Sequence, residues 1–133
     1  MSYFLAYMER NPEFALRLYD RPISFQRLYV SITGKITAAL MLSAAMQWAE
    51  DGDTDGDGWF SKTGEDWSRE TGMSKDEQAT AKARLLDLGI FEERRFRVDN
   101  GMRLVIQYRI NFDVIDRLAI EDDMRHRALA AAH

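Results

Sequence analysis

Two helix-start signals in the middle of the chain constrain the fold most strongly. In Thr63-x-x-Asp66 and Ser74-x-x-Glu77, a hydroxyl and an acidic side chain satisfy backbone N–H groups at a helix N-terminus, as in a capping box. Gly72 suits the end of the first helix, because glycine readily adopts the left-handed conformation found there. Only one residue separates this glycine from the next cap. The pattern predicts two short helices joined by a tight turn.

A β-hairpin is predicted directly after the second helix. Residues 90–98 and 102–110 are rich in strand-forming side chains and flank the turn sequence Asp99-Asn100-Gly101. Asn-Gly supplies two positions that tolerate positive φ, which a type I′ turn requires. Apolar side chains alternate along the second strand, at Leu104, Ile106, Tyr108 and Ile110.

Further helices are expected on both sides of this region. Asn11-Pro12 opens a short helix to about residue 19, and Ser24 caps another that ends at Gly34. Residues 35–49 are apolar over more than one stripe, so this helix is expected in the centre of the core. An Asp/Gly-rich loop (50–58) and a very short strand (59–61) follow, and Asn111 caps a final helix.

Helix, short strand, helix, tight turn, helix and hairpin is the order of elements in a winged helix-turn-helix. We therefore expect a mainly helical α+β fold with additional N-terminal helices and a C-terminal helix. The chain is interpreted as one domain over 1–133, with a helical extension (1–34), a winged-helix core (35–111) and the last helix (112–133).

In this architecture the second helix of the motif lies in the DNA major groove, while the hairpin approaches the backbone or the minor groove. With Ala81, Leu85 and Leu88 facing inward, the opposite face of that helix is predicted to read bases through Lys75, Gln78, Ala79 and Lys82. On the hairpin, phosphate contacts are predicted for Arg94, Arg95, Arg97 and Arg103.

The charge distribution confines any nucleic-acid surface to part of the protein. The formal net charge is −4, which excludes a uniformly cationic protein. Residues 59–111 contain ten Lys/Arg and nine Asp/Glu, a net of +1, and the remainder has a net of −5. Asp76 and Glu77 favour the helix N-terminus electrostatically, yet they repel phosphate where base contacts usually begin.

Two segments resemble a known group of proteins. These are Trp59-Phe60-x-Lys62-Thr63-x-Glu65-Asp66-Trp67 with its continuation to Ile90, and Arg21-Pro22-Ile23-Ser24-Phe25 running into residues 32–40. Both are similar to the winged-helix domain of phage and plasmid replication-initiation or replisome-organiser proteins, and of small phage and prophage proteins. The resemblance covers about residues 21–115 and implies a mobile-element context. Members that act in replication often continue into a further domain.

Other functional classes find little support. The chain contains no cysteine, which excludes thiolate catalysis and disulfides and favours a cytoplasmic location. No catalytic set or cofactor motif is recognisable, so an enzyme is not expected. The loop from Asp51 matches an EF-hand at its first acidic positions and at Gly56, but Lys62 stands where a bidentate Glu is needed, so no metal is predicted. No apolar run is long enough for a membrane helix.

Two functions remain open. The first is a duplex-DNA-binding protein of phage or plasmid origin that acts in replication or transcriptional control. The alternative is a small phage protein that inhibits or recruits a host protein, such as a CRISPR inhibitor, because surface carboxylates can mimic phosphate. A homodimer is also possible, since Ile115, Leu118 and Met124 of the last helix can pair with another copy or pack on the domain itself.

Overall fold

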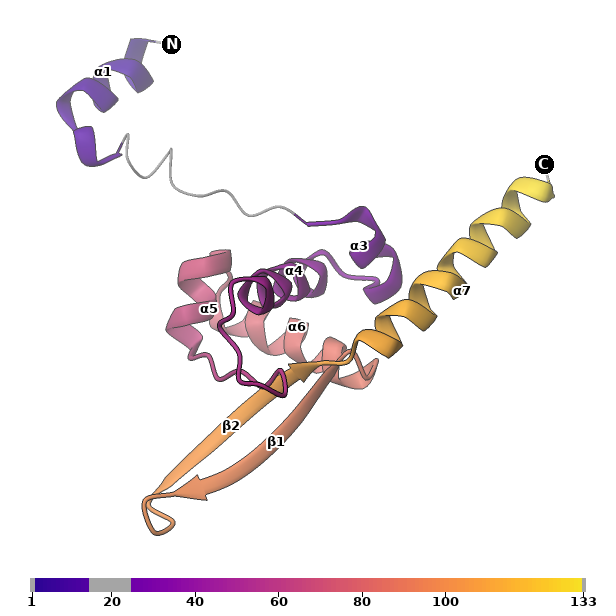
Figure 1. Cartoon of the computed structure of the whole chain (residues 1–133). Helices are drawn as coiled ribbons and strands as arrows, with labels where there is room; N and C mark the ends of the chain where they lie inside the picture. The colour runs from indigo at the N-terminus through magenta and orange to yellow at the C-terminus, as the bar shows by residue number, and fades with distance from the viewer. Residues whose placement is uncertain (1, 15–24, 133) are drawn as a thin grey trace.

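A computed structural model describes residues 2–14 and 25–132 (Figure 1). The protein has a mainly helical α+β fold, and its described residues form one two-stranded antiparallel sheet. In chain order the elements are α1 (Ser2–Arg10), α3 (Arg27–Thr33), α4 (Ile36–Glu50), α5 (Gly64–Thr71), α6 (Lys75–Asp87), β1 (Phe91–Val98), β2 (Arg103–Ile110) and α7 (Phe112–Ala131).

Local signals placed most of these boundaries correctly. Both capping boxes are present, with the Thr63 and Ser74 hydroxyls accepting from backbone N–H groups of α5 and α6. Asn100 and Gly101 have φ of 56° and 85°, as the predicted hairpin turn requires, and Asp99 also has a positive φ of 55°. The helix predicted from Ser24 begins later, at Arg27. Ser24 itself, and residues 15–19 of the helix predicted from residue 11, lie outside the described residues.

The core is built around α4, as its apolar sequence predicts. This helix contacts α3, α5 and α6, and Trp48 near its end belongs to an aromatic cluster with Phe60, Trp67, Phe91 and Tyr108. The Trp48 and Trp67 rings lie 4.5 Å apart between centroids, and Phe60 lies 5.9 Å from Phe91. The cluster therefore joins the helical body to the base of the hairpin.

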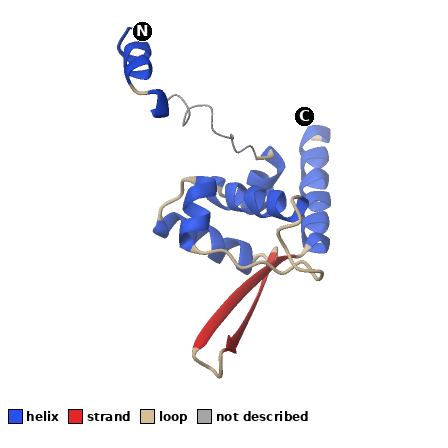
Figure 2. Ribbon diagram, turned by 60° about the vertical axis from the view of Figure 1, so that its left-hand side comes forward, coloured by secondary structure: helices blue, strands red, loops and turns tan. Residues whose placement is uncertain are grey.

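The expected short strand at 59–61 is a single β-bridge. Phe60 and Tyr108 exchange two backbone hydrogen bonds of 2.8 and 2.9 Å. Beyond this bridge the hairpin stands out from the helical body, as Figures 1 and 2 show. The end of the hairpin nearest the body is therefore held by backbone pairing and by aromatic packing, while its tip is exposed.

The first half of α7 packs on the body and the second half extends beyond it (Figure 1). Ile115 is buried, Leu118 is partly buried against the core, and the Ser31 hydroxyl of α3 donates a hydrogen bond to the buried Asp122. Ile115 and Leu118 therefore pack on the domain itself, which is one of the two roles left open for them. Met124 remains 63% exposed.

Trp67→Ala is expected to destabilise the protein by about 3–5 kcal/mol, because the fully buried indole packs against Trp48 and Phe60 of the aromatic cluster. Urea unfolding followed by circular dichroism measures the change. Ile36→Ala is the matched control, since Ile36 is 63% exposed and its truncation should change the free energy of unfolding by less than about 0.5 kcal/mol. Equal losses in the two variants would contradict the packing described.

The Ser31–Asp122 contact predicts a pH dependence. The hydrogen bond from Ser31, with smaller contributions from His126 and Arg125, holds the pKa of Asp122 below its ordinary value of 3.8. A lowered carboxyl pKa stabilises the fold above the unfolded-state pKa, and this contribution is lost as pH falls through the folded-state pKa. Ser31→Ala should therefore lower the urea midpoint at pH 7, and the difference from the parent protein should narrow below about pH 3.8. A difference that is constant with pH would contradict this linkage.

Candidate nucleic-acid interface

Helix α6 is fixed from both ends. At its start, the Ser74 backbone N–H donates to the Glu77 carboxylate at 2.9 Å, and this hydrogen bond lowers the pKa of Glu77. Near its end, Arg84 Nε donates to the carbonyl of the buried Thr33 at 2.7 Å, which ties α6 to the end of α3. Glu77 and Arg84 thus have structural partners, and other side chains must form any binding surface.

Gln78 does not lie on the predicted base-reading face. Its side chain is 7% exposed, and its amide nitrogen donates to the carbonyls of Gly64 and Met73, each at 3.1 Å. These bonds satisfy backbone acceptors beside the tight turn and hold α6 against the start of α5. The predicted exposure of Gln78 is therefore wrong, because a polar helical side chain can be buried when backbone groups satisfy it.

The other three predicted residues of α6 share one side of the helix. Lys75, Ala79 and Lys82 recur at intervals of four and three residues, so they are neighbours on the helix surface. Lys75 and Ala79 are exposed and Lys82 is half-buried. The Lys82 ammonium lies 4.9 Å from the centre of the Tyr108 ring on β2. This side of α6 therefore meets the hairpin.

Charged groups link Lys82 to the hairpin arginines. Burial lowers the pKa of Lys82, while the nearby Glu93 carboxylate acts in the opposite direction. Glu93 pairs across the sheet with Tyr108 and accepts a 2.6 Å hydrogen bond from Arg95 Nε. Lys82, Glu93 and Arg95 thus form a continuous charged path from α6 onto the hairpin.

The four predicted hairpin arginines do not form a single cluster. Directly paired residues share a face of an antiparallel sheet, and successive residues alternate between faces. The register pairs Arg95 with Ile106 and Arg97 with Leu104, which puts these arginines on the face that carries Tyr108. Arg94 and Arg103 belong to the opposite face. We call Lys75, Ala79, Lys82, Arg95 and Arg97 the α6–hairpin surface.

The opposite face of the hairpin contains an aromatic–arginine cluster that the sequence reasoning missed. The guanidinium groups of Arg94 and Arg109 lie 4.3 and 4.6 Å from the centre of the Trp59 ring. Arg94 also donates to Gln107 at 2.8 Å and lies 3.4 Å from Asp55. Period-two alternation could have separated Arg94 from Arg95, but nothing local to residue 59 indicated its contact with this face.

Carboxylates of the Asp-rich loop bond to groups of the protein itself. The Asp55 carboxylate accepts from the backbone N–H groups of Asp57 and Trp59, each at 2.9 Å, and the Trp59 bond is the main cause of its lowered pKa. Asp53 forms an ion pair with Lys62. Within residues 2–14 and 25–132, no group of three or more metal-ligating side chains is assembled.

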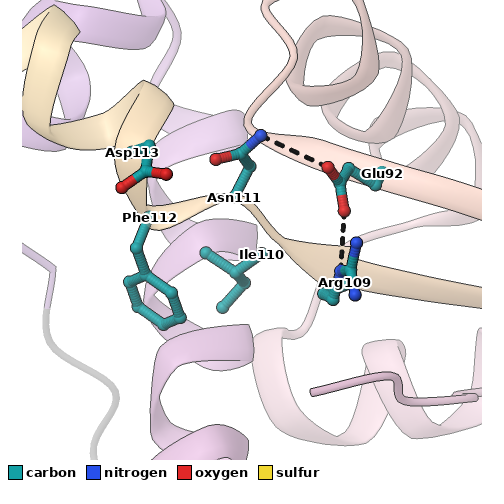
Figure 3. Close-up of a pocket in the computed structure, with 6 residues that line it drawn as sticks. All are labelled: Glu92, Arg109, Ile110, Asn111, Phe112 and Asp113. Carbon is teal, nitrogen blue, oxygen red and sulfur yellow. Dashed lines mark hydrogen bonds and ion pairs between the residues drawn. The ribbon is translucent and has the colours of Figure 1, made fainter. Parts of the chain in front are cut away.

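An open hollow of about 400 Å³ lies where β2 meets α7 (Figure 3). Three of its polar lining residues bond to one another: Arg109 Nε donates to Glu92 at 2.7 Å, and Asn111 Nδ2 donates to the same carboxylate at 3.3 Å. Asn111 also caps α7. These contacts fix the direction in which α7 leaves the sheet.

Gln78→Ala is expected to destabilise the protein by about 1–3 kcal/mol, because two carbonyls beside the tight turn lose their donor. Chemical denaturation measures the loss. Thr80→Ala is the control on the same helix: its exposed hydroxyl donates within the helix to the Asp76 carbonyl at 3.0 Å, so a change below about 0.5 kcal/mol is expected. If both variants were as stable as the parent, Gln78 would not hold the turn.

Comparisons with protein-family models, curated proteins and solved structures gave no match to this chain. What is established is the mainly helical α+β architecture with its two-stranded antiparallel sheet. None of the helices in the described part of the chain is both long and apolar enough to cross a membrane.

Proposed function

We propose that the protein binds duplex DNA through the α6–hairpin surface and acts in replication or transcriptional control of a phage or plasmid. The order of elements supports this proposal. α4, the Phe60 bridge, α5, a tight turn, α6 and a hairpin follow one another as in a winged helix-turn-helix. In that architecture the helix in the position of α6 enters the major groove. The mobile-element setting rests on the sequence resemblance.

The observation that carries the proposal is the continuity of cations between α6 and the hairpin. Lys82 lies over Tyr108, and Arg95 lies on the same hairpin face beside it, bound to Glu93. Glu93 is thereby compensated by two cations and adds little net repulsion toward phosphate. Arg97 extends this face toward the tip, where its guanidinium donates to the Gly101 carbonyl at 3.2 Å.

The residues of this surface take different roles in the proposed complex. Lys75 and the small Ala79 face the base edges, where lysine donates hydrogen bonds and alanine permits close approach. Arg95 and Arg97 contact phosphates. Few cations are available, and most of the affinity depends on phosphate neutralisation. Binding is therefore expected to be weak for one copy and steeply dependent on salt.

A second candidate function is supported by the most exposed side of α6. Asp76, Thr80, Ala83 and Asp87 recur at helical intervals and are exposed, so this stripe combines small side chains with a carboxylate at each end. Such a surface fits a cationic host protein better than it fits DNA. A host-protein inhibitor or recruiter, including an anti-defence factor, is the corresponding function.

Replacing both Arg95 and Arg97 by Ala should reduce the affinity for a random duplex and flatten the salt dependence. Each lost phosphate contact lowers the slope of log K against log salt by about 0.9. Fluorescence anisotropy of a labelled duplex at several salt concentrations measures both quantities. The matched control is Arg94→Ala with Arg103→Ala, which removes the same number of charges from the opposite face and should have a smaller effect.

Three outcomes would count against parts of this proposal. Equal effects of the two double variants would show that the α6–hairpin surface is not the specific contact face. Unequal effects on different DNA sequences would contradict a phosphate role for Arg95 and Arg97. Absence of binding at low salt, with the fold confirmed by circular dichroism, would favour the protein-binding function.

A further inference from the structure

The outward side of α7 forms a regular stripe that no described part of the chain covers. Its members follow one another at intervals of three or four residues, and all are exposed: Asp113, Asp116, Ile120, Met124, Arg127 and Ala131. Ile120 and Met124, at the middle, are 60% and 63% exposed. Burial of two large apolar side chains against another surface lowers the free energy, because it removes them from water.

The charges along this α7 stripe are ordered. Two carboxylates, from Asp113 and Asp116, precede the apolar pair, and the guanidinium of Arg127 follows it. In one copy Arg127 bonds to Asp123 at 2.9 Å, but both side chains are largely exposed, so the arginine can exchange this partner at little cost. A stripe that is acidic at one end and basic at the other is complementary to itself when inverted.

We infer that two copies of this protein associate through antiparallel packing of their α7 helices. A two-fold axis between Ile120 and Met124 brings the apolar pairs of both copies together. On one flank, Asp116 then lies beside Arg127 of the other copy, and this contact occurs twice. Arg117 lies level with Arg127 of the other copy, but on the opposite flank of the α7 stripe. The flank that joins Asp116 to Arg127 is therefore attractive, and the helix dipoles are antiparallel.

This association is independent of DNA binding. One helix face buries less than the roughly 1,200 Å² of a standard interface, so the dimer should form reversibly at high protein concentration. Sedimentation equilibrium of the full chain over a wide concentration range should show the mass rising from 15.4 kDa toward twice that value. A constant mass of 15.4 kDa up to millimolar protein would overturn the inference.

Charge reversal tests the arrangement of the two helices. Asp116→Arg brings arginines together at both contacts, and Arg127→Asp brings carboxylates together. Each single variant should therefore dimerise about tenfold more weakly than the parent. An equimolar mixture of the two variants should associate like the parent, because each contact in the mixed dimer again joins an arginine to an aspartate.

This rescue cannot arise within one helix. Positions 116 and 127 are about 16 Å apart along the axis of α7 at 1.5 Å per residue, too far for direct contact. If the mixture associates no better than either variant alone, the antiparallel arrangement is wrong. Circular dichroism must show native helix content in both variants.

The apolar contact has a matched control on the same helix. Ile120→Asp should abolish dimerisation, because it places a carboxylate in the centre of the interface. Leu129 is similarly exposed, at 62%, but it lies on the same side of α7 as Ile115 and Asp122, away from the α7 stripe. Leu129→Asp should leave the sedimentation behaviour unchanged. A loss of association with Leu129→Asp but not with Ile120→Asp would place the interface on the other side of the helix.

Discussion

The position of the hairpin relative to α6 depends on the aromatic cluster at its base. A two-stranded hairpin alone is only marginally stable in water. Here Phe91 and Tyr108 enter the core beside Phe60, and the backbone bridge between Phe60 and Tyr108 fixes the register at that point. Because Tyr108 also supports Lys82, the same packing that holds the hairpin sets the geometry of the α6–hairpin surface.

The residues that the sequence located correctly are those whose conformation is determined by near neighbours. A hydroxyl three residues before a carboxylate defines the starts of α5 and α6, and Asn100-Gly101 defines the turn of the hairpin. These interactions span a few residues, so their chemistry can be recognised without the rest of the fold. Asn111 at the start of α7 is a further example, because its side chain caps the helix by accepting from the backbone of Val114, three residues later.

The residues that the sequence misplaced or left undecided depend on contacts between distant segments. Gln78 looked like a surface residue on the helical wheel, but the acceptors that bury it belong to Gly64 and Met73 of another segment. Ile115 and Leu118 form an apolar face that packs on the helical body. Helical periodicity shows that such a face is covered, but not whether the domain itself or a second copy covers it. Arg94 and Arg95 lie on opposite faces of the hairpin because successive strand residues alternate between faces. Their closeness in sequence made them look like one cluster.

The division of charges between the two faces of β1 also restricts how another strand can add to its free edge. β1 pairs only with β2 in the described sheet, so its outer backbone groups form a template onto which another strand can add. Residues 92–95 read Glu-Glu-Arg-Arg and alternate between the faces. A second hairpin adding in parallel register would thus place identical charges opposite each other on both faces. Parallel, in-register addition at this edge is therefore disfavoured, whereas antiparallel addition can place Glu93 of one copy opposite Arg95 of another.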